Sequence, residues 1–360
     1  MTTSRDFIGV VPPAWSADDD APLRCVQIRD ETHDVKTFVF AADGGRSFRY
    51  LPGQFVTLEL QIDGQTVNRC YTLSSSPTRP DLAAITVKRV PGGQVSNWLH
   101  ANLHVGDTLA AMGPAGTFSC FAQPAERYLF LSGGSGVTPL MSMTRALHDL
   151  ASDVDVVFVH CARSPADVLF ADELAAMARQ MPRLRLALVC EQQPPHSPYA
   201  GHLGRLDAAL LARIAPDFTA RDVYTCGPAP FMTAVRGLLG TAGYDMARYR
   251  EESFAFDAAP TDPAPTNEAA AGPESFRIKL QKLGDEFACR ADQSILQAAL
   301  AAGLRFPFSC SSGVCGTCKT KKVSGTVDMK HAGGIRQREV DQGWILPCCS
   351  RPGSDIVLER

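Results

Sequence analysis

Three cysteines close together near the C-terminal end are the residues whose spacing most directly indicates chemistry. The stretch "CSSGVCGTC" places Cys310, Cys315 and Cys318 in the pattern C-x4-C-x2-C, and Cys348 follows after 29 residues. Four thiolates at this spacing are typical of plant-type [2Fe–2S] clusters. The competing interpretation is a structural zinc site, but zinc sites usually pair two short C-x2-C segments. We therefore predict an iron–sulfur cluster, and spacing alone leaves Cys348 and the adjacent Cys349 both open as the fourth ligand.

The residues between these cysteines suit a loop that wraps a small cofactor. Gly313 and Gly316 permit backbone conformations that are closed to other residues. Ser311, Ser312 and Thr317 are small, so backbone N–H groups there can point at sulfur and tune the potential of a cluster. Most of the other cysteines are scattered singly and are interpreted as small buried side chains.

The composition is that of an ordinary globular protein with two or three domains. The chain has 360 residues, of which 45% are hydrophobic and 20% charged, and its formal net charge is −3. That charge predicts no general attraction to nucleic acid or to an anionic membrane. No apolar run is long enough to span a bilayer, and the first residues contain no apolar leader segment. We therefore expect a cytoplasmic protein with reduced cysteines.

A glycine-rich turn in the middle of the chain predicts a nucleotide site. The apolar stretch "RYLFL" runs into glycines at 133–136, and a helical pattern follows. Such a turn lets a pyrophosphate approach the backbone and the positive N-terminus of a helix. Further apolar strands alternate with helical stretches and lie at 155–162, 185–190 and 222–228. This alternation predicts a parallel sheet with a nucleotide at its carboxyl edge.

The N-terminal third has a different pattern. Short stretches rich in β-branched and aromatic residues, such as "VKTFVF" and "QFVTLEL", are separated by Pro-Gly and Asp-Gly turns, which predicts an antiparallel β-barrel. "GGQVSNWLHANL" (92–103) adds one helix, with Ser96 near its start, where a second phosphate can rest. Residues 257–273 are rich in proline and alanine, which predicts a linker.

Residues 274–360 resemble plant-type ferredoxin domains over their whole length. The segment "FRIKLQKLGDEFACRADQSILQAALAAGLRFPFSC" is interpreted as two short strands, a helix and the cluster loop. In that family the last ligand follows an L-x-C pattern, which "ILPCC" matches at Cys348. The resemblance therefore favours Cys348 over Cys349.

Residues 23–256 resemble the ferredoxin–NADP reductase superfamily, whose motifs recur here in the family's order. "RCYT" (69–72) is similar to its R-x-Y-[ST] flavin motif, and "GQVSN" (93–97) is similar to its G-x-x-S phosphate motif. "GPAGTF" is similar to the closing turn of its barrel, and "GGSGVTP" and "CGP" are similar to its pyridine-nucleotide motifs. Each motif alone is short and unspecific, but the whole set in this order is specific for the superfamily.

The resemblance implies a role for each matching residue. Arg69 would pair with the flavin phosphates, Tyr71 would pack on the flavin, and Thr72 would hydrogen-bond near its N5 atom. Cys226 would lie near the nicotinamide, so Thr72 and Cys226 are the predicted catalytic residues. Phe254 matches the region that covers the flavin face, with a core aromatic as its alternative. The other residues expected to bind cofactors by resemblance are Gly93, Val95, Ser96, Gly134, Gly136, Thr138, Pro139 and Gly227.

Two cofactor choices depend on short segments. Relatives that use FMN carry G-R-G-G-S where this chain has "GGQVSNWL", which is closer to the FAD-binding members, so FAD is predicted. After the second strand of the parallel sheet come Arg163 and Ser164, with Asp167 further on. Arg163 can pair bidentately with the 2′-phosphate of NADPH, although it can equally be a surface arginine. Many relatives with this domain order prefer NADH, so NADH is favoured and NADPH stays open.

The domain order implies a relay in which NAD(P)H gives a hydride to the flavin and the [2Fe–2S] cluster takes electrons singly. No oxygenase or haem module is recognisable in the sequence, so the acceptor is expected to be a separate protein. The segment 329–352 resembles reductase components of Rieske-type oxygenase systems that demethylate quaternary ammonium compounds such as glycine betaine. Alternatives are a reductase for another redox protein, such as a hybrid-cluster protein, and a non-catalytic redox sensor.

These observations predict a multidomain fold. After an N-terminal tail (1–22) we expect three domains and a linker: an antiparallel β-barrel for FAD (23–123), an α/β parallel-sheet domain for NAD(P) (124–256), the linker (257–273) and a ferredoxin-like β-grasp domain for the cluster (274–360).

Overall fold

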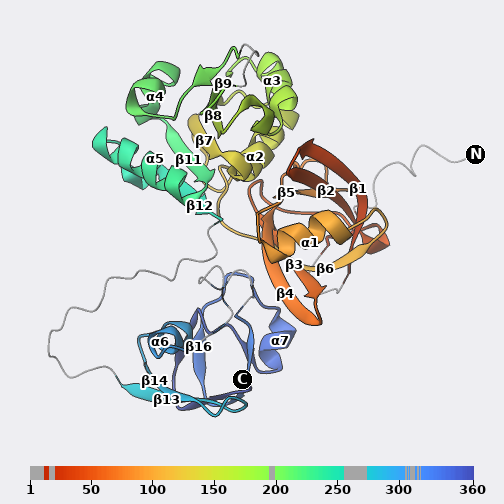
Figure 1. Ribbon diagram of the computed structural model, residues 1–360, viewed down its shortest axis with the longest axis vertical. Helices are drawn as coiled ribbons and strands as arrows, with labels where there is room; N and C mark the ends of the chain where they lie inside the picture. The colour runs from red at the N-terminus through yellow and green to blue at the C-terminus, as the bar shows by residue number, and fades with distance from the viewer. Residues whose placement is uncertain are drawn as a thin grey trace, which may run out of the picture. The chain divides into compact units, whose positions relative to one another are not determined.

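The computed structural model describes residues 12–15, 21–193, 199–254, 274–304, 306, 308, 313, 316 and 318–360 (Figure 1). The predicted linker at 257–273 lies outside this range. The described residues group into two compact units. The first unit comprises residues 1–54, 72–110 and 118–252, and the second comprises 55–71, 111–117 and 253–360.

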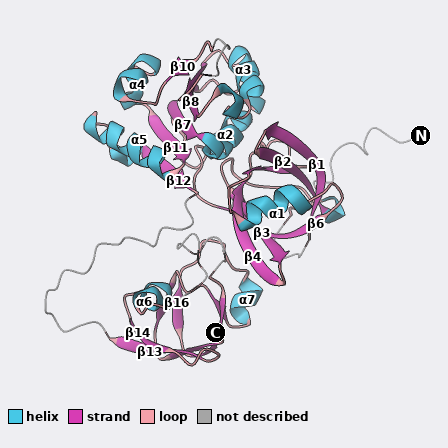
Figure 2. Ribbon diagram, viewed as in Figure 1, coloured by secondary structure: helices cyan, strands magenta, loops and turns pink. Residues whose placement is uncertain are grey.

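The N-terminal part forms a six-stranded sheet with the order β4-β3-β6-β1-β2-β5 (Figure 2). Its elements are β1 (Leu23–Thr32), β2 (Val35–Ala42), β3 (Phe55–Ile62), β4 (Gln65–Thr72), β5 (Ala83–Lys88), β6 (Thr108–Ala115) and the helix α1 (Gln94–Asn102). The β1–β2, β2–β5 and β1–β6 pairs are antiparallel.

The two edges of this sheet meet, as expected for a barrel. Leu73, directly after β4, bridges Ile85 of β5, and the N–H of Ser74 donates to the carbonyl of Ala84. The β3–β4 connection is a two-residue turn in which Asp63 and Gly64 both have positive φ, 51° and 74°. Positive φ at both positions is the requirement of a type I′ turn, whose twist suits a tight β-ribbon, and Asp-Gly is a preferred sequence for it.

The middle of the chain forms a second six-stranded sheet with the order β10-β9-β8-β7-β11-β12. Its strands are β7 (Arg127–Gly133), β8 (Asp155–Ala162), β9 (Leu184–Cys190), β10 (His202–Leu203), β11 (Asp222–Gly227) and β12 (Tyr249–Ser253). Its helices are α2 (Val137–Asp149), α3 (Ala171–Gln180), α4 (Ala208–Ile214) and α5 (Ala229–Thr241). The pairs from β10 to β11 are parallel.

Strand alternation separates the two faces of the parallel sheet. On one face, Leu129, Val157 and Val189 belong to a core that also includes Leu211 of α4 and Leu239 of α5. The intervening residues are aromatic and contact one another: the rings of Tyr128, Phe130, Phe158 and Tyr224 have centroid separations of 5.7 to 6.0 Å. Both faces are buried, as a parallel sheet requires.

The cluster domain, residues 274–360, contains a five-stranded sheet with the order β14-β13-β19-β15-β17 and a β16–β18 pair. Its elements are β13 (Ser275–Leu280), β14 (Glu286–Arg290), α6 (Ile295–Ala301), β15 (Thr320–Ser324), β16 (Val327–Met329), α7 (Gln337–Asp341), β17 (Trp344–Ile345), β18 (Ser350–Pro352) and β19 (Ile356–Leu358). β13 pairs antiparallel with β14 and parallel with β19, and α6 packs on them. Ser294 and Gln297 form a capping box that starts α6.

The described helices include none that is long and apolar enough to cross a membrane.

Candidate functional site

The glycine-rich turn after β7 lies against the end of β11. The chain order reverses between β7 and β11, which is where open α/β sheets bind ligands. A Cβ atom on Gly136 would lie 2.3 Å from the carbonyl oxygen of Cys226, and one on Gly227 would lie 3.1 Å from the nitrogen of Gly133. These contacts leave no room for side chains, so glycine at both positions lets the two loops pack closely at the carboxyl edge of the sheet.

The helix α2 starts at this edge and completes the predicted nucleotide site. Gly134 has a φ of 52° and opens the short turn that leads into the 13-residue helix. Thr138 donates from its hydroxyl to the carbonyl of Ser135 at 3.2 Å, and Pro139 stands in the first turn of the helix. The free backbone N–H groups of a helix N-terminus favour a pyrophosphate. The structure therefore brings together Gly134, Gly136 and Gly227 as a cradle that fits a dinucleotide.

Cys226 is a fully buried thiol. Burial raises its pKa well above the usual range, and the negative charges of Glu252 and Glu251 raise it further. A thiol in this environment stays protonated at neutral pH, so Cys226 is suited to packing against a ligand and unsuited to nucleophilic attack.

Thr72 forms a hydrogen bond with an acidic residue that no sequence motif predicted. Its hydroxyl donates to Oε2 of Glu252 at 3.5 Å, and Thr72 itself is only 5% exposed. Glu252 lies on β12, two residues before Phe254, the residue predicted to cover the flavin face. Glu252 belongs to the string "EESF", in which the family resemblance pointed to the aromatic Phe254. Phe254 follows β12 and is half-buried.

The flavin motif occupies the end of β4. Arg69 and Tyr71 alternate with Cys70 along the strand, so Arg69 and Tyr71 share one face and can contact one ligand. Tyr71 is half-buried, and burial raises the pKa of its hydroxyl far above the usual value, partly offset by the charge of Arg69. Tyr71 is therefore neutral, as a ring that packs on a flavin should be.

The phosphate motif starts α1. Gly93 is the N-cap, and a Cβ there would lie 2.7 Å from the Ser96 hydroxyl. Ser96 is buried and accepts a hydrogen bond from the N–H of Val90 at 3.1 Å, which leaves its own hydroxyl proton available as a donor. Val95 is buried and anchors the turn. These donors suit the phosphates of a flavin nucleotide.

The cluster loop is described in part, because Cys310 and Cys315 lie outside the described residues. Cys318 is 2% exposed and packs with Ile335 and Leu346, and Cys348 packs against the same group. The fold therefore brings Cys318 and Cys348 together although 29 residues separate them. A buried and a half-buried thiol that pack against the same residues beside a glycine-bent loop fit a thiolate-bound cluster.

The two glycines of the loop have positive φ, 73° at Gly313 and 69° at Gly316. The carbonyl of Gly313 accepts hydrogen bonds from the N–H groups of Ala332 and Gly334, both at 3.0 Å. A Cβ on Gly316 would lie 2.6 Å from the carbonyl oxygen of Gly334. The loop is thus tied closely to the segment before α7, and only glycine fits at these two positions.

Cys349 lies beside the same loop. Its Sγ would be 2.7 Å from a Cβ on Gly313, and its thiol donates to the carbonyl of Leu346 at 3.6 Å. Both thiols of the Cys348–Cys349 pair are therefore near the loop, and Cys348 as the ligand stays a prediction.

Arg163 directly follows β8 and is exposed. Its carbonyl accepts from the N–H of Gln192 at 2.8 Å, which holds its backbone at the carboxyl edge of the sheet. Asp167 is engaged locally, because Ser164 donates to its carboxylate at 2.7 Å. Arg163 as a contact of the nucleotide ribose stays a prediction.

Together, the barrel, the doubly wound parallel sheet and the β-grasp domain define a modular flavin- and nicotinamide-dependent reductase with an iron–sulfur domain. Three family models match in the same order: an oxidoreductase FAD-binding domain over residues 22–120, an oxidoreductase NAD-binding domain over 130–237 and a 2Fe-2S iron-sulfur cluster binding domain over 278–353.

The chain belongs to the family of reductase subunits of oxygenase systems. It is 44% identical to the glycine betaine monooxygenase reductase subunit of Pseudomonas aeruginosa (strain UCBPP-PA14), over 99% of this chain and 100% of that protein. It is 42% identical to the stachydrine N-demethylase reductase subunit of Rhizobium meliloti (strain 1021), over 96% and 97% of the two chains. It is 34% identical to the ferredoxin reductase component of the 3-ketosteroid-9-alpha-monooxygenase of Rhodococcus rhodochrous, over 91% and 92%.

Solved structures show the same architecture. The structure of phthalate dioxygenase reductase matches 96% of this chain and 100% of its own, with a TM-score of 0.58 and 24% identity, which shows the fold. The FAD/NAD-binding domain of the nitric oxide dioxygenase of Vibrio cholerae matches 65% of this chain and 98% of its own, with a TM-score of 0.58 and 27% identity. The predicted fold class is confirmed, and so are the expected FAD, nicotinamide and [2Fe–2S] cofactors.

Proposed function

We propose that this reductase takes a hydride from NADH and passes single electrons to a separate Rieske-type oxygenase that demethylates a quaternary ammonium compound. The observation that carries this proposal is the 44% identity over essentially the full length of both chains to a glycine betaine monooxygenase reductase subunit. The 42% identity to a stachydrine N-demethylase reductase subunit supports the same class of substrate.

When bound, a flavin accepts two electrons as a hydride and releases them one at a time, and a [2Fe–2S] cluster carries one electron. The protein residues bind and orient these groups. Arg69 would pair with the phosphates of FAD, and Tyr71 would pack on it. Ser96 would donate its hydroxyl to a phosphate. Gly134 and Gly136 admit the pyrophosphate of the nicotinamide nucleotide to the start of α2.

Thr72, Cys226 and Glu252 would serve the hydride-transfer site. The Thr72 hydroxyl, which donates to Glu252 at 3.5 Å, would orient the flavin, and the neutral Cys226 thiol would pack against the nicotinamide. The carboxylate of Glu252 would supply a negative charge that favours an oxidised, positively charged nicotinamide. Cys310, Cys315, Cys318 and Cys348 would hold the cluster through their thiolates.

The nucleotide preference has a direct test. We propose NADH because Arg163, the basic residue that follows β8, is exposed, and because Asp167 further on carries a negative charge that disfavours a 2′-phosphate. The measurement is kcat/KM for both donors in the wild type and in Arg163→Ala. A strong preference for NADPH that disappears in Arg163→Ala would show instead that Arg163 binds a 2′-phosphate.

The electron acceptor is tested by reconstitution. The purified chain, loaded with FAD and cluster, is combined with a purified Rieske oxygenase from the same organism, and NADH oxidation, oxygen uptake and formaldehyde release are measured with glycine betaine and with stachydrine. Substrate-dependent formaldehyde release coupled to NADH oxidation supports the proposal. Cofactor binding without turnover of any acceptor would make the chain a redox sensor.

We further propose that the protein acts in the cytoplasm, where reduced nicotinamide nucleotides are available. Cell fractionation with an antibody against the chain tests this, and recovery with the periplasmic fraction would contradict it.

A further inference from the structure

An ion-pair group in the second unit joins the flavin-binding sheet to the cluster domain. Glu59 comes from β3, next to the strand that carries the flavin motif, whereas Lys319, Arg336 and Glu339 come from the cluster domain. Arg336 Nη2 lies 3.2 Å from Glu59 Oε2, and Lys319 Nζ lies 3.8 Å from Glu59 Oε1. Glu339 supplies a second negative charge to the group, and its Oε1 lies 2.6 Å from Lys319 Nζ.

All four side chains are largely withdrawn from water. Their side-chain exposures are 16% for Glu59, 9% for Arg336, 17% for Lys319 and 15% for Glu339. Charges this far buried are retained only where each has partners, because an unpaired buried charge is costly. Arg336 also donates to the carbonyl of Ala111 in β6 at 3.4 Å, so the guanidinium bridges two strands of the sheet to the cluster domain.

Apolar and amide contacts continue this interface to the cluster loop. A Cβ on Gly316 would lie 3.1 Å from Met112 Cε and 3.5 Å from Asn68 Nδ2, and a Cβ on Gly333 would lie 3.3 Å from Ala115 Cβ. Asn68 is the residue directly before Arg69 of the flavin motif. Gly316 of the cluster loop therefore lies near Asn68 on β4, the strand with the predicted flavin motif, and Lys319 of the ion-pair group is hydrogen-bonded to Gly316.

Lys319 places the ion-pair group directly next to the predicted cluster ligands. Lys319 directly follows Cys318, a predicted cluster ligand, and its N–H donates to the carbonyl of Gly316 at 3.1 Å. A carboxylate on β3 thus holds the residue next to a cluster ligand, which fixes the approach of the cluster to the flavin strand.

We propose that Glu59 is the anchor onto which the cluster domain docks for electron transfer from flavin to cluster. The proposal rests on the proposed function, since it concerns the electron path of that reductase. Glu59 acts as a positioning residue: it receives Arg336 and Lys319 and holds the cluster loop against β4. Lys319 and Arg336 are then occupied inside the molecule and do not serve a partner protein.

Zero-length cross-linking tests the contact in the intact, cofactor-loaded chain. A carbodiimide activates the Glu59 carboxylate, the Lys319 amine attacks it to form an amide, and the reagent leaves as its urea. Peptide mapping should find the Glu59–Lys319 link beside the Glu339–Lys319 link, which forms within one domain and is the internal control. Detection of the Glu339–Lys319 link without the Glu59–Lys319 link would overturn the proposal.

The kinetic test separates docking from hydride transfer. In anaerobic stopped-flow experiments with NADH, Glu59→Gln should reduce flavin at the wild-type rate but reduce the cluster at least about threefold more slowly. The matched control Glu286→Gln, on β14, should leave both rates unchanged.

A double-mutant cycle shows whether Glu59 and Arg336 act together. Arg336→Gln should slow cluster reduction like Glu59→Gln, and the double variant should be little slower than either single variant. Independent, multiplying effects, or an unchanged rate in Glu59→Gln with intact cluster absorption, would contradict docking through this pair. Failure of NADH to reduce the wild-type flavin would instead contradict the proposed function.

Discussion

Thr72, Cys226 and Glu252 come from three separate strands or strand ends, and the fold brings their polar atoms to one site. Sequence motifs pointed to Thr72 and Cys226, since each lies in a recognisable short string. Glu252 could not be predicted in the same way, because a glutamate near a strand end is usually a solvated surface charge. Its role becomes visible only through the hydrogen bond from Thr72 and its charge effect on Cys226.

Replacement of Thr72 by valine should slow flavin reduction by NADH about fivefold, because one hydrogen bond worth ~1 kcal/mol is lost from the reacting edge. The affinity for FAD should change little. Stopped-flow absorbance of the flavin measures the rate. Thr66→Val is the matched control, since Thr66 lies on the same strand and bonds only to Gln61 in the exposed turn region. Equal rates in wild type and Thr72→Val would remove Thr72 from the hydride-transfer site.

The neighbouring thiols Cys348 and Cys349 can be distinguished by iron content. Cys348→Ser should lose the [2Fe–2S] cluster, because a serine oxygen replaces one of four thiolates, whereas Cys349→Ser should keep it. Iron and sulfide analysis with visible absorbance of anaerobically prepared protein provides the measurement. Retention of the cluster in Cys348→Ser with loss in Cys349→Ser would reassign the fourth ligand, and zinc in place of iron would contradict the cluster itself.

At the scale of elements, Arg221 fixes the start of β11 to its neighbours. The side chain is 0% exposed and donates to Asp155 at 2.8 Å and to Asp217 at 2.8 Å, and it also bonds the carbonyl of Tyr128 on β7. This arginine joins β7, β8 and β11 at the edge opposite the nucleotide site.

Arg221→Met should lower the free energy of unfolding by about 3 kcal/mol, because two partly buried carboxylates lose their partner. Calorimetry on the intact chain should show a lower Tm. Arg183→Met is the control: its pair with Asp153 is exposed and long, at 3.5 Å, so its effect should stay within roughly 0.5 kcal/mol. A Tm unchanged by Arg221→Met would show that the network contributes nothing.

The same network predicts a pH dependence. The hydrogen bonds from Arg221 lower the pKa values of both Asp155 and Asp217. Their folded-state pKa values lie below those of the unfolded chain, so their stabilisation is complete above the unfolded pKa of about 4 and is lost as pH falls through the folded values. Thermal unfolding followed from pH 7 to pH 3 should show a steeper acid loss of Tm in wild type than in Arg221→Met. Parallel curves would contradict this assignment.

Most elements could be predicted from local patterns. Alternating residues such as those of "VKTFVF" form β2, the helical "ADELAAMARQ" forms α3, and the glycine turn at 133–136 leads into α2 as expected. The grouping of β3 and β4 with the cluster domain could not be predicted, because it depends on side chains more than 200 residues apart, such as Glu59 and Arg336. Local periodicity carries no information about such pairs.

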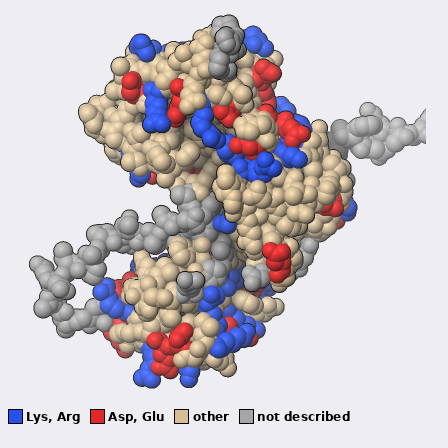
Figure 3. Space-filling view, in the orientation of Figure 1, with Lys and Arg blue, Asp and Glu red and all other residues tan. Residues whose placement is uncertain are grey.

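At the scale of the whole molecule, charge is divided unevenly along the chain. Residues 274–360 contain 13 lysines and arginines against 9 aspartates and glutamates, so they carry a formal +4 and the remaining residues carry −7. Charges of both signs are interleaved on the visible face (Figure 3). The basic residues that follow the cluster loop differ in their surroundings.

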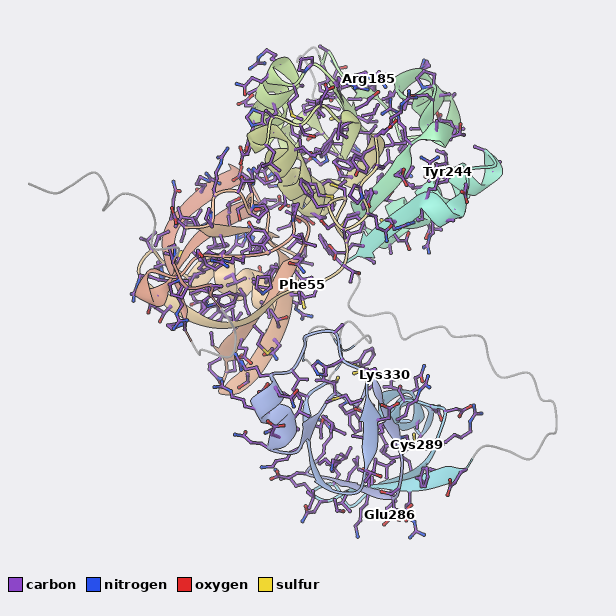
Figure 4. All side chains as sticks on the ribbon, turned by 180° about the vertical axis from the view of Figure 1, so that it is seen from behind. Phe55, Arg185, Tyr244, Glu286, Cys289 and Lys330 are labelled. Atoms are coloured by element: carbon purple, nitrogen blue, oxygen red, sulfur yellow. The ribbon has the colours of Figure 1, made fainter. Side chains whose placement is uncertain are left out.

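Lys321 and Lys322 are half-buried and engaged within the domain: Lys321 lies over the ring of Trp344, and Lys322 donates to the carbonyl of Gly325 at 2.7 Å. Lys330 is different, with 83% of its side chain exposed. Its N–H donates to the carbonyl of Cys349 at 3.2 Å, so it lies beside the residue that follows the predicted cluster ligand Cys348. Figure 4 shows Lys330 and Glu286 at opposite ends of the cluster domain.

Lys330→Glu should therefore slow electron transfer to the oxygenase several-fold at low salt, and the difference should shrink as ionic strength rises, because exposed charges are screened beyond about 8 Å at physiological salt. Flavin and cluster reduction by NADH should stay normal. Lys279→Glu is the control, since Lys279 pairs in register with Glu286 at the far end. Equal transfer rates for both variants and wild type at every salt concentration would contradict docking near Lys330.

The two-residue turn at Asp63–Gly64 restricts how this molecule can change over evolution. Side chains on a β-ribbon alternate between its faces, so one residue inserted between Ile62 and Gln65 would shift the alignment of β4 with β3 by one position. Arg69 and Tyr71 would then exchange faces with Asn68 and Cys70. Surface turns elsewhere in a protein usually tolerate changes in length. Functional homologues should show no such change in this turn, because a single added codon would turn the predicted flavin-binding side chains to the opposite face of the ribbon.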